Sequence, residues 1–188
     1  MTDAPLRPSV PLTFHHEPKV WIGCLECYNA GRLVGAWYAA SEAAGITTSE
    51  LHARDIPADT HEELWCLDIE NFPEAKEMDP TTAQMWGDLY EEVGDAQWSA
   101  FCAWVRSGSH VEGGDGMPDT GEFEDRYAGE WDSWDEYVRN YVEGTSLQEG
   151  WPDDAIRFFD MGRYGRELLV DYSVEDAPNG GVFIFRDN

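Results

Sequence analysis

The chain has 188 residues, of which 38 are acidic and 12 basic, and its formal net charge is −26. This balance excludes direct binding to nucleic acid, because phosphates are neutralised by Lys and Arg and the chain has only two lysines. With 42% hydrophobic and 13% aromatic residues, it has enough apolar material for folded cores. No apolar run approaches the roughly 18 residues of a membrane span, and the N-terminus lacks a signal-peptide pattern, so we expect a cytosolic protein with no membrane partner.

The negative charge is concentrated in the middle of the chain. From Asp55 to Glu143 there are 24 acidic and four basic side chains, a net charge of −20, and the two flanks together carry −6. Six tryptophans lie in the same stretch, whereas disordered acidic segments have few aromatic residues. The sequence therefore predicts an acidic surface mounted on folded structure, with a positively charged partner.

The first third of the chain predicts a small α+β unit. Residues 1–18 are rich in proline and predict a flexible arm. Residues 20–22 and 33–38 have the composition of two strands, and the Asn and Gly of 28–31 suit the reversing loop of a hairpin. Thr48 and the residues after it predict a short capped helix, and 64–69 predicts a third strand. This N-terminal unit spans 19–73.

A helical unit is expected over 74–107. After Pro80, with Thr81 or Thr82 as the cap, the apolar residues recur with the period of a helix. The acidic residues of this segment fall on the opposite side: Asp88, Glu91, Glu92 and Asp95. Gly94 ends this helix and Asp95 caps the next, in which Trp98, Phe101, Cys102 and Val105 form a buried stripe.

The last third predicts a second α+β unit over 108–188. Residues 107–121 are rich in Gly, Ser and Asp and predict an exposed loop. Ser133 and Glu136 form a capping box before an apolar stripe that ends near Gly144. A helix is expected from Pro152 to about Phe159. Two strands, 168–174 and 181–186, follow around a turn at 178–181. The fold class is α+β.

The sequence contains no convincing metal site or catalytic set. Cys24 and Cys27 form one CxxC pair, and Cys66 and Cys102 are solitary among apolar residues. A zinc site needs a second closely spaced pair of ligands, which the five histidines do not offer, so we expect free thiols with no metal and no cofactor. The nucleophile-elbow, phosphate-loop and zinc-protease motifs are absent, which favours a protein that is not an enzyme.

The charge itself suggests a function. Duplex DNA carries one charge per about 1.7 Å of axis, so −26 matches the phosphates of about 13 base pairs, and a two-fold dimer would match about 26. An elongated acidic dimer would present a density of charge similar to that of DNA to proteins that bind DNA. The alternatives are an acidic chaperone-like or scaffold protein that shields other basic DNA-binding partners, and a salt-adapted globular enzyme.

Three stretches of the chain have distinctive motifs: residues 20–38, VWIGCLECYNAGRLVGAWY; residues 158–168, FFDMGRYGREL; and residues 180–185, GGVFIF. The first resembles the opening strand, the Tyr-Asn-x-Gly-x-Leu turn and the Gly-x-Trp of the ArdA antirestriction proteins. The second is similar to the antirestriction motif of that family, and the third to its C-terminal strand. The three occur in the family's order over about 19–188.

The resemblance implies an elongated protein of three small units that dimerises through its C-terminal unit and mimics bent DNA. Its partner would be a type I restriction–modification enzyme, whose DNA-binding channel it would occupy. The expected DNA-mimic surface comprises Asp88, Glu91, Glu92, Asp95, Glu122, Glu124, Asp125, Asp132, Asp135 and Glu136. The expected motif and dimer interface comprise Phe159, Asp160, Arg163, Tyr164, Gly165, Arg166, Glu167 and Leu168. A structural role for this motif is favoured, since arginines imitate phosphate poorly.

Overall fold

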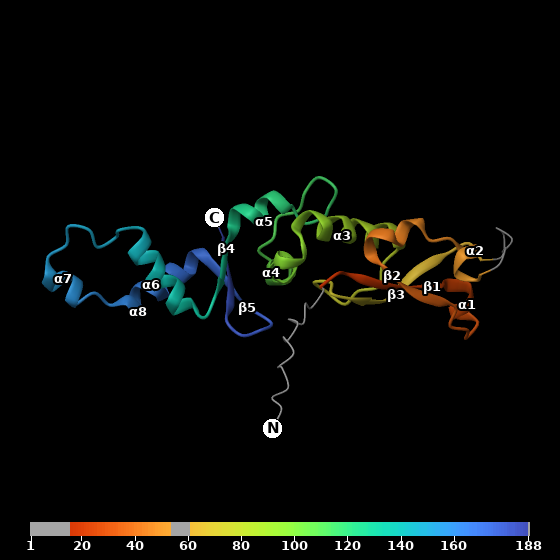
Figure 1. The fold of residues 1–188 in the computed structure, drawn as a ribbon, viewed down its shortest axis with the longest axis horizontal. Coiled ribbons are helices and arrows are strands. Elements are labelled where there is room, and N and C mark those ends of the chain that lie inside the picture. The colour runs from red at the N-terminus through yellow and green to blue at the C-terminus, as the bar shows by residue number, and fades with distance from the viewer. Residues whose placement is uncertain (1–15, 54–60, 188) are drawn as a thin grey trace, which may run out of the picture.

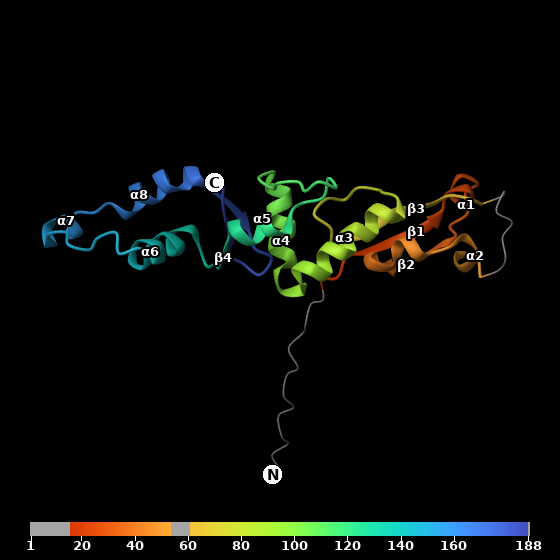
Figure 2. The same cartoon turned by 90° about the horizontal axis from the view of Figure 1, so that it is seen from above.

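The structure is a computed structural model, and it describes residues 16–53 and 61–187. Figures 1 and 2 show an elongated molecule, with an N-terminal sheet at one end and helices α6, α7 and α8 toward the other. Two three-stranded antiparallel sheets and several helices follow one another along the long axis. The α+β fold class is thus confirmed. The flexible arm predicted over 1–18 lies almost entirely outside the described residues.

The N-terminal sheet is built around β1 (Lys19–Cys24), which pairs with β2 (Gly35–Ala39) on one side and β3 (Leu64–Glu70) on the other. Both pairings are antiparallel, so the predicted hairpin and third strand are confirmed. The connection between β1 and β2 is more structured than a simple loop, because α1 (Leu25–Asn29) forms within it. The 3₁₀ helix η1 (Ala40–Gly45) follows β2.

The short helix α2 (Thr48–Leu51) forms where the sequence predicts it. Its cap is Thr47, whose hydroxyl accepts a hydrogen bond from the backbone N–H of Glu50 at 3.2 Å. This bond satisfies one of the backbone donors left free at the start of a helix.

Two central helices, α3 (Pro80–Val93) and α4 (Asp95–Ser107), form the middle of the molecule. The predicted cap of α3 is wrong: the cap is Asp79, whose carboxylate accepts hydrogen bonds from the backbone N–H groups of Thr81 and Thr82. Pro80 explains the difference, because proline is favoured at the first helical position and the cap must then precede it.

Helix α3 lies very close to η1. A Cβ atom on Gly87 would lie 2.2 Å from the backbone nitrogen of Ser41, so only glycine permits this approach. The contact joins the N-terminal unit to the central helices, because Ala83 of α3 belongs to the apolar cluster that Val20 and Ile22 of β1 form.

The C-terminal sheet has the strand order β4-β6-β5, with antiparallel pairing throughout. Its strands are β4 (Tyr127–Trp131), β5 (Tyr172–Asp176) and β6 (Val182–Arg186). Helix α5 (Thr120–Arg126) precedes β4, and α6 (Trp134–Gly144) follows it. The Ser133 cap of α6 is confirmed, because its Oγ accepts the Glu136 N–H at 3.2 Å. The Glu136 carboxylate reaches one residue past the predicted partner and accepts the N–H of Asp132, which precedes the cap, at 3.0 Å.

The segment between α6 and β5 differs from its prediction. It contains α7 (Asp153–Arg157), α8 (Met161–Leu168) and the 3₁₀ helix η2 (Leu169–Asp171). The strand predicted to begin at residue 168 therefore begins only at Tyr172. Helix α8 starts at the Asp160 carboxylate, which accepts the N–H of Arg163 at 2.9 Å.

Three apolar clusters form the cores. One is built on β1 and β3, and another on α6 and β6. The largest joins α4 to Phe123 of α5 and to Phe183 and Phe185 of β6, so the central helices share a core with the C-terminal sheet. The unit boundaries predicted near 73 and 107 stay predictions, and these clusters extend across both positions. Within the described residues, no helix is long and apolar enough to span a membrane.

Candidate DNA-mimic surface

The charge of the molecule lies on its surface. Among the residues that the structure describes, no charged side chain is buried. Because water screens exposed charges and a folded core does not, this arrangement keeps the cost of their mutual repulsion low. It also leaves the carboxylates available to a partner.

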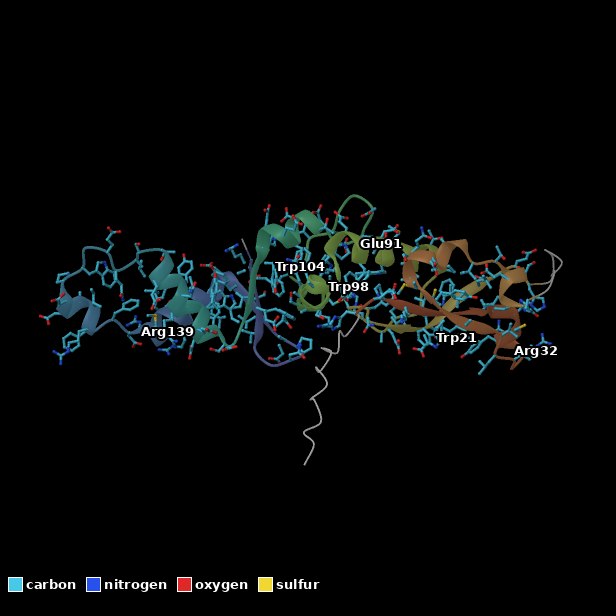
Figure 3. All side chains as sticks on the ribbon, in the orientation of Figure 1. Trp21, Arg32, Glu91, Trp98, Trp104 and Arg139 are labelled. Carbon is cyan, nitrogen blue, oxygen red and sulfur yellow. The ribbon has the colours of Figure 1, made fainter. Side chains whose placement is uncertain are left out.

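Helix α3 separates its apolar and acidic sides as predicted. Trp86 and Leu89 pack against the largest core cluster, whereas Asp88, Glu91 and Glu92 are exposed. Figure 3 shows Glu91 on the outer edge of the molecule, away from the buried Trp98 and Trp104.

Helix α5 extends the acidic side of α3 and lies along the same edge of the molecule (Figure 1). The two helices are joined where the Thr120 hydroxyl donates a hydrogen bond of 2.7 Å to the Glu92 carboxylate. Glu124 and Asp125 on α5 are exposed. We call the following five residues the acidic edge: Asp88, Glu91, Glu92, Glu124 and Asp125.

Two further predicted acids are exposed beyond the acidic edge. Asp132 follows β4, and Asp135 lies in the first turn of α6. Carboxylates in the first turn of a helix are favoured by the partial positive charge of its N-terminus. The position of Asp135 thus stabilises α6 and presents charge to solvent.

Three predicted surface acids instead hold the fold together. Asp95 lies in the first turn of α4, where its carboxylate accepts hydrogen bonds from the His16 N–H at 2.8 Å and the Tyr90 hydroxyl at 3.2 Å. Glu122 forms an ion pair with Arg126 at 3.0 Å. Glu136 accepts the Asp132 N–H at the start of α6. These side chains are half-buried and partly committed to internal partners, so the more exposed acids are better placed to bind another protein, although Glu92 among them also accepts a hydrogen bond from Thr120.

A dense aromatic core fixes the spacing of the acidic edge. Trp98 stacks on Phe101 with ring centroids 5.4 Å apart, and Phe101 meets Phe123 edge-on at 5.2 Å. Trp104 also packs against Phe123, at 5.7 Å. Since Phe123 belongs to α5 and the other rings to α4, this packing holds α5 in a fixed place beside the central helices.

The predicted motif forms α8 and the residues just before this helix, and α8 packs against α6. Gly165 is buried, and a Cβ atom there would lie 3.3 Å from Val138. The Trp134 indole N–H donates a hydrogen bond of 3.1 Å to the Gly165 carbonyl. Tyr164 contacts Phe159, with ring centroids 5.5 Å apart, and its partial burial raises the pKa of its hydroxyl. These contacts give this half of the motif a structural role.

The other motif residues face solvent or the helix ends. Arg163, Arg166 and Glu167 are exposed on α8, Asp160 caps the helix, and Leu168 is half-buried in the C-terminal core. Exposed apolar side chains flank α8: Phe158 is 78% exposed before it, and Val170 is 80% exposed after it. Such side chains favour contact with another protein.

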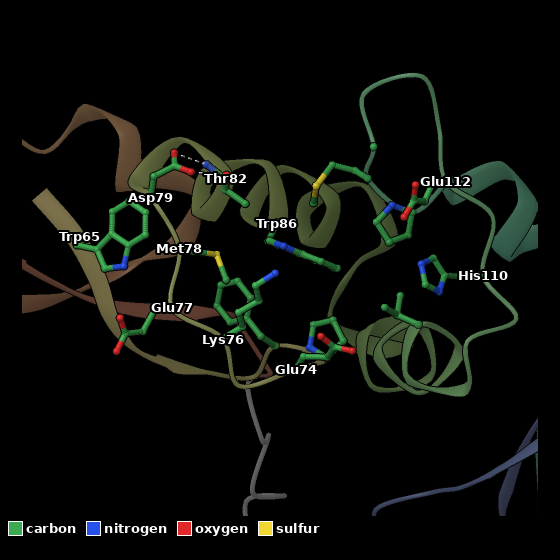
Figure 4. A pocket seen from close by; sticks show the side chains of 16 residues that line it. Trp65, Glu74, Lys76, Glu77, Met78, Asp79, Thr82, Trp86, His110 and Glu112 are labelled. Carbon is green, nitrogen blue, oxygen red and sulfur yellow. Dashed lines mark hydrogen bonds between the residues drawn. The ribbon is translucent and has the colours of Figure 1, made fainter.

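An open groove of about 620 Å³ lies beside α3 (Figure 4). Glu74 and Lys76 from the segment before α3 line it, together with Trp86 and His110. The hydrogen bonds drawn there join Thr82 and Asp79 and cap α3.

One cluster of polar side chains, at the N-terminal end of the molecule, is not evident from the sequence. His52 and His61 lie against Cys24 and Cys27, although neither histidine is close to this pair in sequence. The two solitary thiols have no such neighbours: burial raises the pKa of Cys66 and of Cys102 to about 12, so both are inert neutral side chains.

Comparison with known proteins agrees with the sequence motifs. The family model described as antirestriction protein (ArdA) matches residues 20–183, from β1 to β6. A search of the curated proteins finds no match. The family match includes both sheets, the acidic edge and α8, and we conclude that the chain belongs to the ArdA family of antirestriction proteins.

Proposed function

We propose that the protein inhibits type I restriction–modification enzymes by occupying their DNA-binding channel. The observation that carries this proposal is the acidic edge: five exposed carboxylates on two helices, held by one aromatic core within a segment of net charge −20. A channel built to bind DNA is lined by basic side chains, because it must neutralise phosphates. Carboxylates held in fixed places can form ion pairs with those basic side chains, and the enzyme cannot cleave them as it cleaves DNA.

The shape of the molecule supports the same proposal. The elements follow one another along one axis (Figure 1), so the surface charge is spread along a rod. At physiological salt, charges farther apart than about 8 Å are largely screened from one another. A rod therefore presents many local contacts to a long channel, and each contributes its own small share of the binding energy.

We further propose that two copies associate through the C-terminal unit. The exposed Phe158 and Val170 support this, because exposed apolar side chains that gather in one region of a surface mark sites of contact with other proteins. The motif residues between them, from Asp160 to Leu168, would shape this surface by packing α8 against α6. A dimer would double the length of the acidic rod.

A restriction assay tests the proposal. Purified type I enzyme is incubated with unmodified DNA and ATP at increasing concentrations of the protein, and cleavage is measured. We expect cleavage to fall to the level without enzyme, and we expect an excess of competitor DNA to slow the onset of inhibition. Undiminished cleavage by several type I enzymes would refute the proposal.

A control separates inhibition from adaptation to salt. If the charge served only to keep the chain folded in concentrated salt, the structure would be lost at low ionic strength. We expect the circular dichroism spectrum to be the same at low and at molar salt, because the carboxylates are exposed and the cores are apolar.

A further inference from the structure

Four potential metal ligands meet at the N-terminal end of the molecule, from four separate segments. Cys24 ends β1, Cys27 lies in α1, His52 caps the end of α2, and His61 precedes β3. One ligand atom from each lies within 4.8 Å of all the others. Both sulfurs are buried and both imidazoles are half-buried, so the cluster is largely shielded from solvent.

The distances fit a single tetrahedral metal ion. The Cys24 sulfur lies 3.1 Å from His61 Nδ1, and the Cys27 sulfur lies 3.4 Å from His52 Nε2 and 3.6 Å from His61 Nδ1. A tetrahedral zinc ion with Zn–S bonds of about 2.3 Å and Zn–N bonds of about 2.0 Å holds sulfur and nitrogen roughly 3.5 Å apart. The four atoms therefore already surround a space of the right size.

The surroundings of the cluster suit ligation. His52 Nδ1 lies 2.7 Å from the carbonyl oxygen of Thr48, to which it donates when it carries the proton. The lone pair is then on Nε2, the atom that faces the Cys27 sulfur. Metal-binding histidines commonly have such a carbonyl partner, which fixes the ring and its tautomer. The Arg32 side chain donates a hydrogen bond to the Cys27 sulfur at 3.7 Å, so the sulfur already has a polar neighbour.

We propose that Cys24, Cys27, His52 and His61 bind one structural zinc ion. Zinc takes two sulfur and two nitrogen ligands in many small folded units, and a site with four protein ligands leaves no open position for catalysis. The ion would tie α1 and the end of α2 to the start of β3. Two thiolates balance its charge, so binding leaves the net charge of the protein unchanged.

A disulfide does not account for the cluster. Both cysteines are free, and a Cys24–Cys27 bond would need neither imidazole. The sequence predicts no metal, because it offers no second pair of ligands at close spacing. His52 and His61 are separated in the chain by a longer segment: the antiparallel pairing of β1 with β3 brings His61 to the CxxC pair, and His52 reaches it from the end of α2.

Metal analysis of the full-length protein tests the proposal. The chain is produced without a histidine tag in medium containing zinc, and its metal content is measured by mass spectrometry. We expect one zinc per chain, and we expect Cys27→Ser and His61→Gln to lose it. Cys102→Ser removes a buried thiol elsewhere and should keep it, which makes it the matched control. Circular dichroism identifies variants that fail to fold.

Cobalt titration of the unaltered protein gives an answer that does not depend on the variants. After the metal is removed with a chelator, added Co²⁺ should produce the strong visible absorption of a tetrahedral site with thiolate ligands, saturating at one equivalent. The chelated protein should also unfold at a lower temperature than the zinc-loaded one. A protein with no zinc and no cobalt spectrum, or with a Cys24–Cys27 disulfide by mass, would overturn the proposal.

Discussion

Removing charge from the acidic edge should weaken inhibition in proportion to the number of carboxylates removed. We consider a triple variant, Asp88→Asn, Glu91→Gln and Glu124→Gln, in which each substitution keeps the size and polarity of an exposed side chain. An exposed ion pair contributes about 0.2–1 kcal/mol. Three of them sum to roughly 0.6–3 kcal/mol, a loss of affinity of about 3- to 150-fold. A single substitution should cost about fivefold or less.

The comparison needs a variant with the same loss of charge in another place. Glu26→Gln, Glu42→Gln and Glu50→Gln together remove three exposed carboxylates from the N-terminal unit, outside the most acidic segment. Both triple variants have a net charge of −23, so a difference between them reflects the place of the charge. We expect this second variant to inhibit within about threefold of the unaltered protein.

The assay is inhibition of DNA cleavage by a type I enzyme at two salt concentrations, with folding checked by circular dichroism. The difference between the triple variants should shrink as salt rises, because screening weakens exposed ion pairs. Equal losses in the two variants would show that only total charge matters. Complete loss from a single Asp88→Asn, in a folded protein, would contradict a distributed surface.

Three further predictions concern the fold and the proposed dimer. Asp79→Ala should lower the stability of α3 by about 1 kcal/mol, measured by thermal unfolding. The hydrogen bonds from the Thr82 hydroxyl and backbone N–H lower the pKa of the Asp79 carboxyl in the folded protein. The stability that Asp79 contributes should therefore be fully present above the ordinary pKa of an aspartate and be lost as pH falls through the lowered pKa. If the stability of the variant fell with acid as steeply as that of the unaltered protein, this reasoning would be refuted. Gly87→Ala should destabilise the protein by about 1–3 kcal/mol, since the added methyl meets backbone, whereas Gly45→Ala has open space and should be nearly neutral. If two copies associate as proposed, Val170→Glu should lower the mass measured by light scattering toward that of one chain, and an unchanged dimeric mass would contradict an interface at Val170.

The sequence predicts best where local and tertiary preferences agree. The capping box at Ser133 and Glu136 precedes an apolar stripe, and α6 forms there as expected. In α3, the apolar and acidic faces can also be predicted locally, because the spacing of residues along a regular helix decides on which face each side chain lies. Elements of this kind can be read from periodicity and caps alone.

The differences arise where distant residues decide the structure. Helix α8 contains two glycines and reads poorly as a helix, yet Gly165 permits close packing on α6 and the Trp134 indole binds its carbonyl. Asp95 is predicted from the sequence as a helix cap on the acidic side, yet Gly94 is the cap of α4. The hydrogen bond from the His16 N–H to the Asp95 carboxylate joins residues 79 positions apart and becomes evident only in the folded chain. The same holds for the histidines beside the CxxC pair, of which His61 is placed by the pairing of β1 with β3 and His52 by α2.

The central claim, that the protein takes the place of DNA, is tested most directly by competition at equilibrium. A type I enzyme is first bound to a fluorescent duplex that contains its recognition site, and the protein is then added while anisotropy and complex mass are followed. We predict full displacement of the duplex, with an apparent affinity that weakens in proportion to the DNA concentration. A ternary complex of enzyme, duplex and protein, or inhibition without any release of DNA, would contradict it.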